Sequence, residues 1–127
     1  MNFSQDTDES AGSIHSYTEQ YFVINQAKYD CHCQLHKSGL ADSWAPEDPA
    51  NLQLSDFQQL IDCQPDVIIL GSGKRLKFPD NKLRRAFAEL NIGLEVMDTG
   101  AACRTYNVLL SEDRNVAAAI LLLNSDY

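Results

Sequence analysis

Two runs of apolar residues in the second half of the chain predict strands that are buried on both faces. Residues 67–70 are β-branched or leucine and are bounded by Asp66 and Gly71, while residues 116–123 are apolar at every position. Continuous apolar strands are typical of sheets that are covered on both sides. We therefore expect both runs inside a sheet, and residues 94–97 form a further short strand.

Between these strands, apolar residues recur at helical spacing. They predict one helix over about 81–90, capped by Asp80, and another over about 100–110, capped by Asp98 or Thr99. The inward positions are Leu83, Phe87 and Leu90 in the first helix and Ala102, Tyr106 and Leu109 in the second. A strand, a helix and a strand within about thirty residues form a βαβ unit, which implies parallel pairing and a right-handed crossover.

The first half of the chain predicts β structure followed by a loop. β-prone residues over 14–24, a turn at 25–27 and a second strand over 28–35 indicate a hairpin or small meander. Residues 36–51 contain glycine and proline and predict mostly loop, which Trp44 attaches to the core.

A short helix follows this loop. Ser55 and Gln58 match a capping box, and Pro65 ends the helix. Its apolar side chains are Phe57, Leu60 and Ile61. Residues 1–13 predict a flexible terminus, so the expected organisation is a single α/β domain over 14–127.

The composition is that of one globular domain. The 127 residues are 44% hydrophobic and 22% charged, with a formal net charge of −8. This acidic balance argues against binding to nucleic acid or anionic membranes, because both need a basic surface. The longest apolar run has eight residues, whereas a membrane-spanning helix needs about 20. Without a secretory or transit signal, the chain is expected in the cytoplasm, where its four cysteines are reduced.

The few basic residues are concentrated in one stretch. Residues 1–66 carry eleven acidic and two basic residues, whereas 74–85 carries six basic residues and one acid, Asp80. The six are Lys74, Arg75, Lys77, Lys82, Arg84 and Arg85. Two interpretations stay open: an ordinary solvated helix face, or a docking surface for an acidic partner or a phosphate group.

Gly71-Ser72-Gly73 follows a buried strand and invites comparison with nucleotide-binding loops. The dinucleotide fingerprint needs a third glycine or alanine where this chain has Leu76, and the P-loop needs a Ser or Thr after Lys74. Both patterns fail. The glycines then indicate a tight turn, or a loop whose N–H groups hold a small anion.

A second polar cluster, residues 98–107, begins where another parallel strand ends. Ligands of open α/β sheets bind beyond the carboxyl ends of the strands, and two neighbouring strands would place Ser72 and Asp98 on one rim. The candidate ligand-binding residues at this rim are Gly71, Ser72, Gly73, Asp98, Thr99, Cys103, Arg104, Tyr106 and Asn107.

Cys103 is open to two interpretations. Near a helix start, the helix dipole and Arg104 would lower the pKa of its thiol and make it a nucleophile. However, all three histidines lie between positions 15 and 36, so no histidine partner is at hand in this half. The alternative is that Asp98 or Thr99 only caps the helix and that Cys103 packs in the core.

Cys31-His32-Cys33 is the candidate metal motif. On a strand, Cys31 and Cys33 share a face and His32 points away, whereas zinc sites usually space paired cysteines by about two to four residues. Cys63 and His36 are the further candidates, and neither has matching spacing. We therefore expect no metal and no cofactor.

These residues together resemble one known family. It comprises small, mostly uncharacterised α/β proteins of the Mth938-like type and includes a mitochondrial assembly factor of respiratory complex I and the adipogenesis-associated domain protein of animals. The match is specific over 66–123 and looser over 14–44, where only the order of strands agrees. The motif positions shared with the family are Gly71, Gly73, Asp98, Thr99, Cys103, Tyr106 and Asn107.

The resemblance implies a three-layer α/β domain with a central mixed sheet and additional N-terminal β structure. It implies no established catalytic activity, and the size and layout are those of the bacterial members. The first candidate function is a non-enzymatic, assembly-factor-like module that docks a protein partner or small ligand. The second is a small-ligand-binding protein or enzyme that uses a crevice at Ser72, Asp98 and Cys103. The third is a purely structural domain, and the sequence determines neither the partner nor the oligomeric state.

Overall fold

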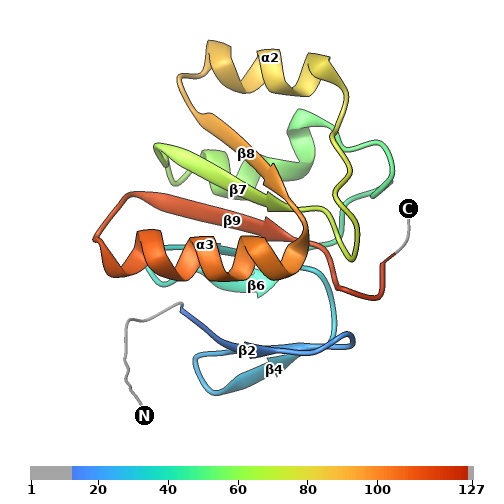
Figure 1. The fold of residues 1–127 in the computed structure, drawn as a ribbon. Helices are drawn as coiled ribbons and strands as arrows, with labels where there is room; N and C mark the ends of the chain where they lie inside the picture. The colour runs from blue at the N-terminus through green and yellow to red at the C-terminus, as the bar shows by residue number, and fades with distance from the viewer. Residues whose placement is uncertain (1–12, 126–127) are drawn as a thin grey trace.

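The computed structural model describes residues 13–125 (Figure 1). The flexible terminus predicted for 1–13 lies, apart from Ser13, outside the described residues, and the domain boundary at residue 14 stays a prediction. Among the described residues, no helix combines the length and the apolar character that a bilayer crossing requires.

A five-stranded mixed sheet forms the centre of the molecule. Its order is β6 (Ala41–Ser43), β5 (Cys33–His36), β9 (Val116–Ile120), β7 (Val67–Gly71) and β8 (Gly93–Met97). β7 pairs in parallel with both β8 and β9, whereas β5 pairs antiparallel with β9 and β6. The predicted mixed, partly parallel sheet with a βαβ crossover is confirmed.

β7 and β9 are interior strands, and their side chains alternate between the two faces of the sheet. Ile69, Ala118 and Ile120 enter the core on one face, while Ile68 and Leu70 enter the core on the other. Every residue of β9 is buried. Burial on both faces is the physical reason for the two continuous apolar runs, and their predicted placement inside the sheet is confirmed. β9 ends at Ile120, so residues 121–123 of the predicted run lie beyond the strand.

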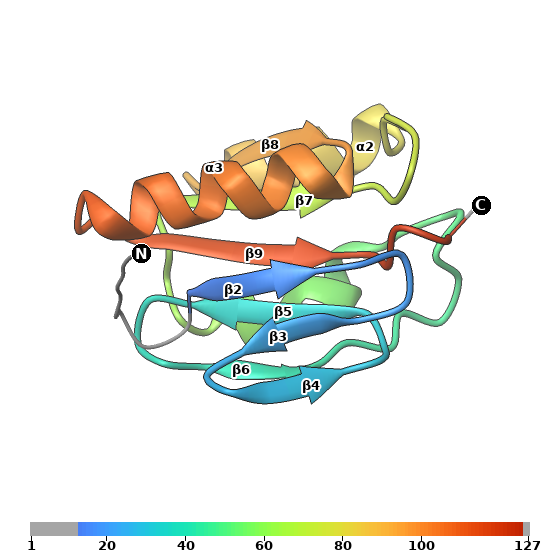
Figure 2. The ribbon, with the colours of Figure 1, turned by 60° about the horizontal axis from the view of Figure 1, so that its bottom comes forward.

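Helix α3 and a second, three-stranded sheet cover one face of the central sheet (Figure 2). The helix runs over Thr99–Ser111, and the small antiparallel sheet has the order β2 (Ile14–Tyr17), β3 (Phe22–Ile24) and β4 (Ala27–Tyr29). The predicted three layers and N-terminal meander are therefore present.

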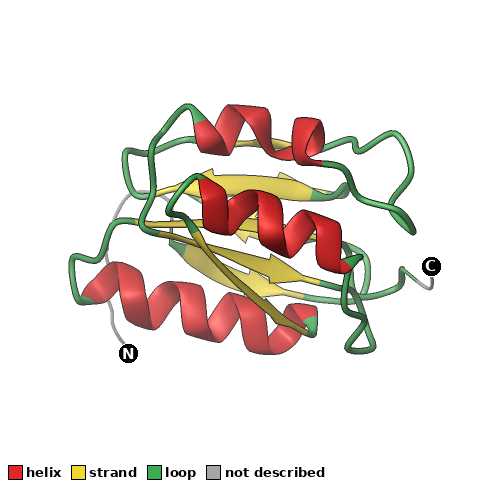
Figure 3. Cartoon of the chain, turned by 90° about the horizontal axis from the view of Figure 1, so that it is seen from above, coloured by secondary structure: helices red, strands yellow, loops and turns green. Residues whose placement is uncertain are grey.

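The other face is covered by η1 (Leu54–Phe57), α1 (Gln58–Ile61) and α2 (Asn81–Glu89), between which the strands are visible in Figure 3. The Asp80 side chain caps α2 by accepting from the N–H of Lys82 at 2.8 Å, as predicted. Leu83 and Phe87 are buried as predicted.

Aromatic side chains join the helices on this face. The ring centroids of Trp44 and Phe57 are 5.4 Å apart, and those of Phe57 and Phe87 are 5.2 Å apart in an edge-on arrangement. Trp44 Nε1 also donates to the carbonyl oxygen of Asp56 at 2.7 Å. The prediction that Trp44 attaches its loop to the core is confirmed.

The single strand predicted over 28–35 is wrong, because the chain leaves one sheet and enters the other within it. β4 ends at Tyr29 and β5 begins at Cys33. Between them, the carbonyl of His32 accepts from the N–H of Trp44 at 2.7 Å, and His32 Nδ1 accepts from the N–H of Leu122 at 3.0 Å. These long-range bonds hold the crossing.

Three smaller predictions also differ from the structure. The capping box is formed by Gln53 and Asp56 at the start of η1, two residues earlier than the predicted Ser55 and Gln58. β6 lies in the segment predicted mostly as loop. Leu90 is exposed because it follows the last turn of α2.

Candidate functional site

The ends of β7 and β8 meet at one edge of the sheet, as their parallel pairing requires. The N–H of Ser72 donates to the carbonyl oxygen of Met97 at 2.9 Å, and the N–H of Thr99 donates to that of Gly73 at 2.8 Å. The structure therefore brings Gly71, Ser72 and Gly73 together with Asp98 and Thr99. We call these five residues, with Cys103, the strand tip.

Thr99 fills the centre of the strand tip. Its side chain is fully buried, and its hydroxyl accepts from the N–H of Gly73 at 2.8 Å while donating to the carbonyl oxygen of Leu121 at 2.6 Å. The side chain of Asp98 accepts from the N–H of Ala101 at 3.0 Å and thereby caps α3. The N–H groups of Ser72 and Gly73 are thus paired within the protein instead of facing an anion.

Positions 71 and 73 each require glycine, for different structural reasons. A Cβ atom at Gly71 would lie 2.9 Å from Thr99 Oγ1 and 3.0 Å from Ile120 Cγ2, so only glycine lets α3 approach β7 this closely. Gly73 has φ of +102°, a conformation that side chains disfavour. Both positions serve close packing and a turn.

Cys103 is buried, with 1% of its surface exposed. Burial raises the pKa of its thiol to about 12, and the positive charge of Arg104 opposes this only in part. A thiol with this pKa stays protonated at neutral pH, so the geometry favours the packing interpretation of Cys103 over the nucleophile.

The remaining candidate residues of α3 attach the three-stranded sheet. Asn107 accepts from the N–H of Ile14 at 2.9 Å and donates to the carbonyl oxygen of Ile14 at 2.8 Å. Arg104 donates to the hydroxyl of Tyr17 at 3.0 Å. Tyr106 is buried, which raises the pKa of its hydroxyl, and that hydroxyl has no hydrogen-bond partner among the described residues.

The six basic residues from Lys74 to Arg85 are all exposed, and two apolar side chains lie among them. Leu76 and Phe78 are 52% and 66% exposed. The guanidinium of Arg84 lies 6.0 Å from the centre of the Phe78 ring, within the range of a cation–π contact. We call the six basic residues with Leu76 and Phe78 the basic surface.

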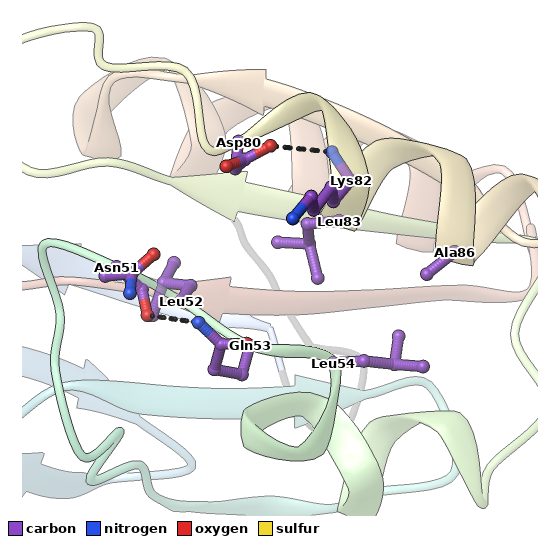
Figure 4. Close-up of a pocket in the computed structure, with 8 residues that line it drawn as sticks. All are labelled: Asn51, Leu52, Gln53, Leu54, Asp80, Lys82, Leu83 and Ala86. Carbon is purple, nitrogen blue, oxygen red and sulfur yellow. Dashed lines mark hydrogen bonds between the residues drawn. The ribbon is translucent and has the colours of Figure 1, made fainter.

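A groove runs beside the basic surface, and sequence reasoning missed it. A cavity of about 350 Å³ lies between residues 51–54 and the start of α2 (Figure 4). A smaller cavity of about 100 Å³ adjoins Ser72 and Phe78. Leu52 lines both. The walls come from segments that meet only in the folded chain, so no local pattern predicts them.

One of the further candidate metal ligands, His36, has other contacts. His36, which is buried, hydrogen-bonds through its two ring nitrogens to Ser38 at 2.9 Å and Asn115 at 2.8 Å. Within residues 13–125, no three His, Cys, Asp or Glu side chains are grouped in a way that would hold a metal ion. All four cysteines are free thiols.

Known proteins share both the sequence pattern and the fold. The pattern of the family described as protein of unknown function DUF498/DUF598 matches residues 14–121. A relative from Xenopus tropicalis, NADH dehydrogenase (ubiquinone) 1 alpha subcomplex assembly factor 3, is 28% identical over 109 residues, which cover 85% of this chain. The chain spans 60% of the length of that relative.

Solved structures match over nearly the whole chain. A crystal structure of a Bordetella parapertussis protein has a TM-score of 0.81 at 30% identity and covers 91% of this chain and 99% of its own. A solution structure of a Mth938-like domain from Bordetella pertussis has a TM-score of 0.81 at 25% identity, covering 99% and 95%. The resemblance predicted from residues 66–123 is confirmed.

Proposed function

Because the chain belongs to the DUF498/DUF598 family of Mth938-like proteins, we propose that it is a non-enzymatic, assembly-factor-like module that docks a protein partner through its basic surface. The observation that carries this proposal is the concentration of six exposed cations around two exposed apolar side chains, Leu76 and Phe78. Protein interfaces commonly combine an apolar centre with a polar or charged rim. A relative named as an assembly factor supports a role in binding other proteins.

The cytoplasm is the proposed location. Four free thiols are typical of a reducing compartment. Fractionation of the native host with an antibody against the chain tests the location, and recovery with the envelope fraction after salt washing would contradict it.

The test of docking compares charge-reversed variants in the native host. The double variant Arg84→Glu/Arg85→Glu places two negative charges on α2, and Arg114→Glu is a matched control in the loop before β9. We expect wild type and Arg114→Glu to capture the same partner, and the double variant to lose it. Purified partner and chain should then bind directly. A partner set that is identical for all three proteins would contradict the proposal.

A small-ligand site at Ser72, Asp98 and Cys103 is the second candidate function, and one observation favours it. Ser72 lines the cavity of about 100 Å³. The Ser72 hydroxyl, however, donates to the carbonyl oxygen of Arg75 at 2.7 Å and accepts from the N–H of Lys77 at 3.0 Å. A thiol titration decides the enzymatic form of this proposal: a Cys103 thiolate that appears only above about pH 8.5 leaves no nucleophile.

A further inference from the structure

We propose that the groove beside the basic surface binds an extended, acidic segment of the partner, which places one large apolar side chain in the smaller cavity. This proposal rests on the proposed docking function and adds the chemistry of the bound segment. Extended peptides are recognised in grooves that provide main-chain partners and side-chain pockets.

The two cavities adjoin each other. They share Leu52, and their linings also include two consecutive residues, Pro79 in the smaller cavity and Asp80 in the larger one. Residues of the segments 49–54 and 77–86 line both cavities, and Leu70, Ser72 and Leu121 complete the smaller one. In the part of the chain that the structure describes, the main-chain N–H and C=O of Leu52 have no hydrogen-bond partner. We expect a bound chain to pair with them.

The charges beside the groove select an acidic segment. Lys77 lines the smaller cavity and Lys82 the larger one, and the other four basic residues of the basic surface flank them. On the α2 side, the acid in the wall is Asp80, whose carboxylate caps the helix. Next to the facing segment, the carboxylate of Asp56 accepts from the N–H of Gln53 at 2.7 Å. In a chain of net charge −8, this cationic stretch gives an acidic partner one favourable place to bind.

The smaller cavity has the dimensions and lining of an anchor pocket. Leu70, Leu121 and Leu52 line it and are 1%, 3% and 8% exposed. The ring of Phe78 lies at its rim and is 66% exposed. Its volume of about 100 Å³ is below the ~300–1,000 Å³ of most small-molecule sites. It suits one buried side chain of a larger partner, the usual form of a binding hot spot.

The same cations would also attract an anionic lipid surface. A bilayer is broad and would contact exposed Leu76 and Phe78, but it would not enter a groove between two segments of chain. The groove therefore favours a peptide segment, and lipid binding is an outcome of the test.

The experiment selects ligands from a library of short random peptides displayed on phage, with the full chain as bait. We expect selected peptides to be rich in Asp and Glu around one Phe, Leu or Trp. Replacing that apolar residue by Ser, or the acids by Lys, should weaken binding by about tenfold or more. Peptides without acidic enrichment, or with binding that ignores both replacements, would overturn the proposal.

Variants then locate the bound peptide. Phe78→Ala and Lys82→Glu should each weaken binding about fivefold or more, whereas the matched controls Val108→Ala and Arg114→Glu should stay within about twofold. Val108 is an apolar control of similar exposure, at 53%, on α3. Amide shifts in NMR should change at Leu52 and Leu83. Equal effects of the test and control variants would overturn the groove.

Two further outcomes separate the proposals. If phosphatidylcholine–phosphatidylglycerol vesicles bind the chain through Phe78 and no acidic peptide is selected, the ligand is a lipid surface and the peptide proposal is wrong. If the host partner is lost in Arg84→Glu/Arg85→Glu but acidic peptides do not bind, docking stands and the groove is wrong. If partner capture ignores the charge reversal, the docking function itself fails.

Discussion

The strand tip and the basic surface are neighbours along the chain, but they use their polar groups in opposite ways. At the strand tip, the Thr99 hydroxyl both accepts from Gly73 and donates to Leu121, and Cys103 is buried. Immediately after Gly73, the chain exposes cations together with Leu76 and Phe78. The residues most reminiscent of a catalytic motif thus have their polar groups paired or buried, while the exposed polar groups lie beside them, on the surface for which we propose docking.

The largest effect on the strand tip is expected from Gly71→Ala. The added methyl group would lie 2.9 Å from Thr99 Oγ1 and 3.1 Å from Ala102 Cβ, so α3 must move away from β7. Such overpacking should lower the free energy of unfolding by about 1–3 kcal/mol. The matched control is Gly93→Ala in β8, where the nearest atom would be 3.6 Å away. Urea denaturation of both variants measures this, and equal stability would show that the tip is not closely packed.

Thr99→Val should give an effect of similar size. Valine keeps the shape of threonine but leaves the N–H of Gly73 and the carbonyl of Leu121 without their partner, which should cost about 1–3 kcal/mol. Thr105→Val on the same helix is the control, since Thr105 is only partly buried. Thermal unfolding compares the two. Unchanged stability together with loss of a ligand would instead favour a binding site at the tip.

Acidification should loosen the chain next to the strand tip. Burial lowers the pKa of His32 from its ordinary value of 6.5, and its neutral Nδ1 accepts from the N–H of Leu122. As the pH falls through this ordinary value, His32 is protonated in the unfolded chain before it is protonated in the native state. The stabilisation that neutral His32 provides is therefore fully present above that pH and is lost progressively below it. The free energy of unfolding, measured at pH values around and below the ordinary pKa of histidine, should depend less on pH in His32→Gln than in wild type. Identical profiles would contradict the role of His32.

The smallest effect on stability is expected from Phe78→Ala on the basic surface. The ring is 66% exposed, so the free energy of unfolding should change by no more than about 0.5 kcal/mol. The same variant should clearly weaken partner binding. Chemical denaturation and a binding titration on one preparation check both statements. A large loss of stability would mean that Phe78 belongs to the core, and this would contradict the contrast between a packed strand tip and an exposed basic surface.

The sequence predicts the central part of this fold well, because the signals there are strong and local. The apolar runs of β7 and β9 require burial on both faces, and Asp80 and Asp98 mark the starts of α2 and α3. The break between β4 and β5 is not predictable, since bonds from His32 to Trp44 and Leu122 hold it.

The position of the candidate site could be predicted from the sequence, but the burial of its side chains could not. Parallel pairing places Ser72 near Asp98, whereas the burial of Cys103 depends on how α3 packs on the sheet. The groove depends on the approach of residues 51–54 to α2, which no periodicity in either segment encodes.

The most direct test is to measure which of the two regions binds the partner. Affinity for the purified host partner is determined for Cys103→Ala, which changes the strand tip, and for Arg84→Glu/Arg85→Glu, which changes the basic surface. We predict that Cys103→Ala binds like wild type and that the double variant loses at least about tenfold in affinity. Normal binding by the double variant together with loss in Cys103→Ala would contradict it.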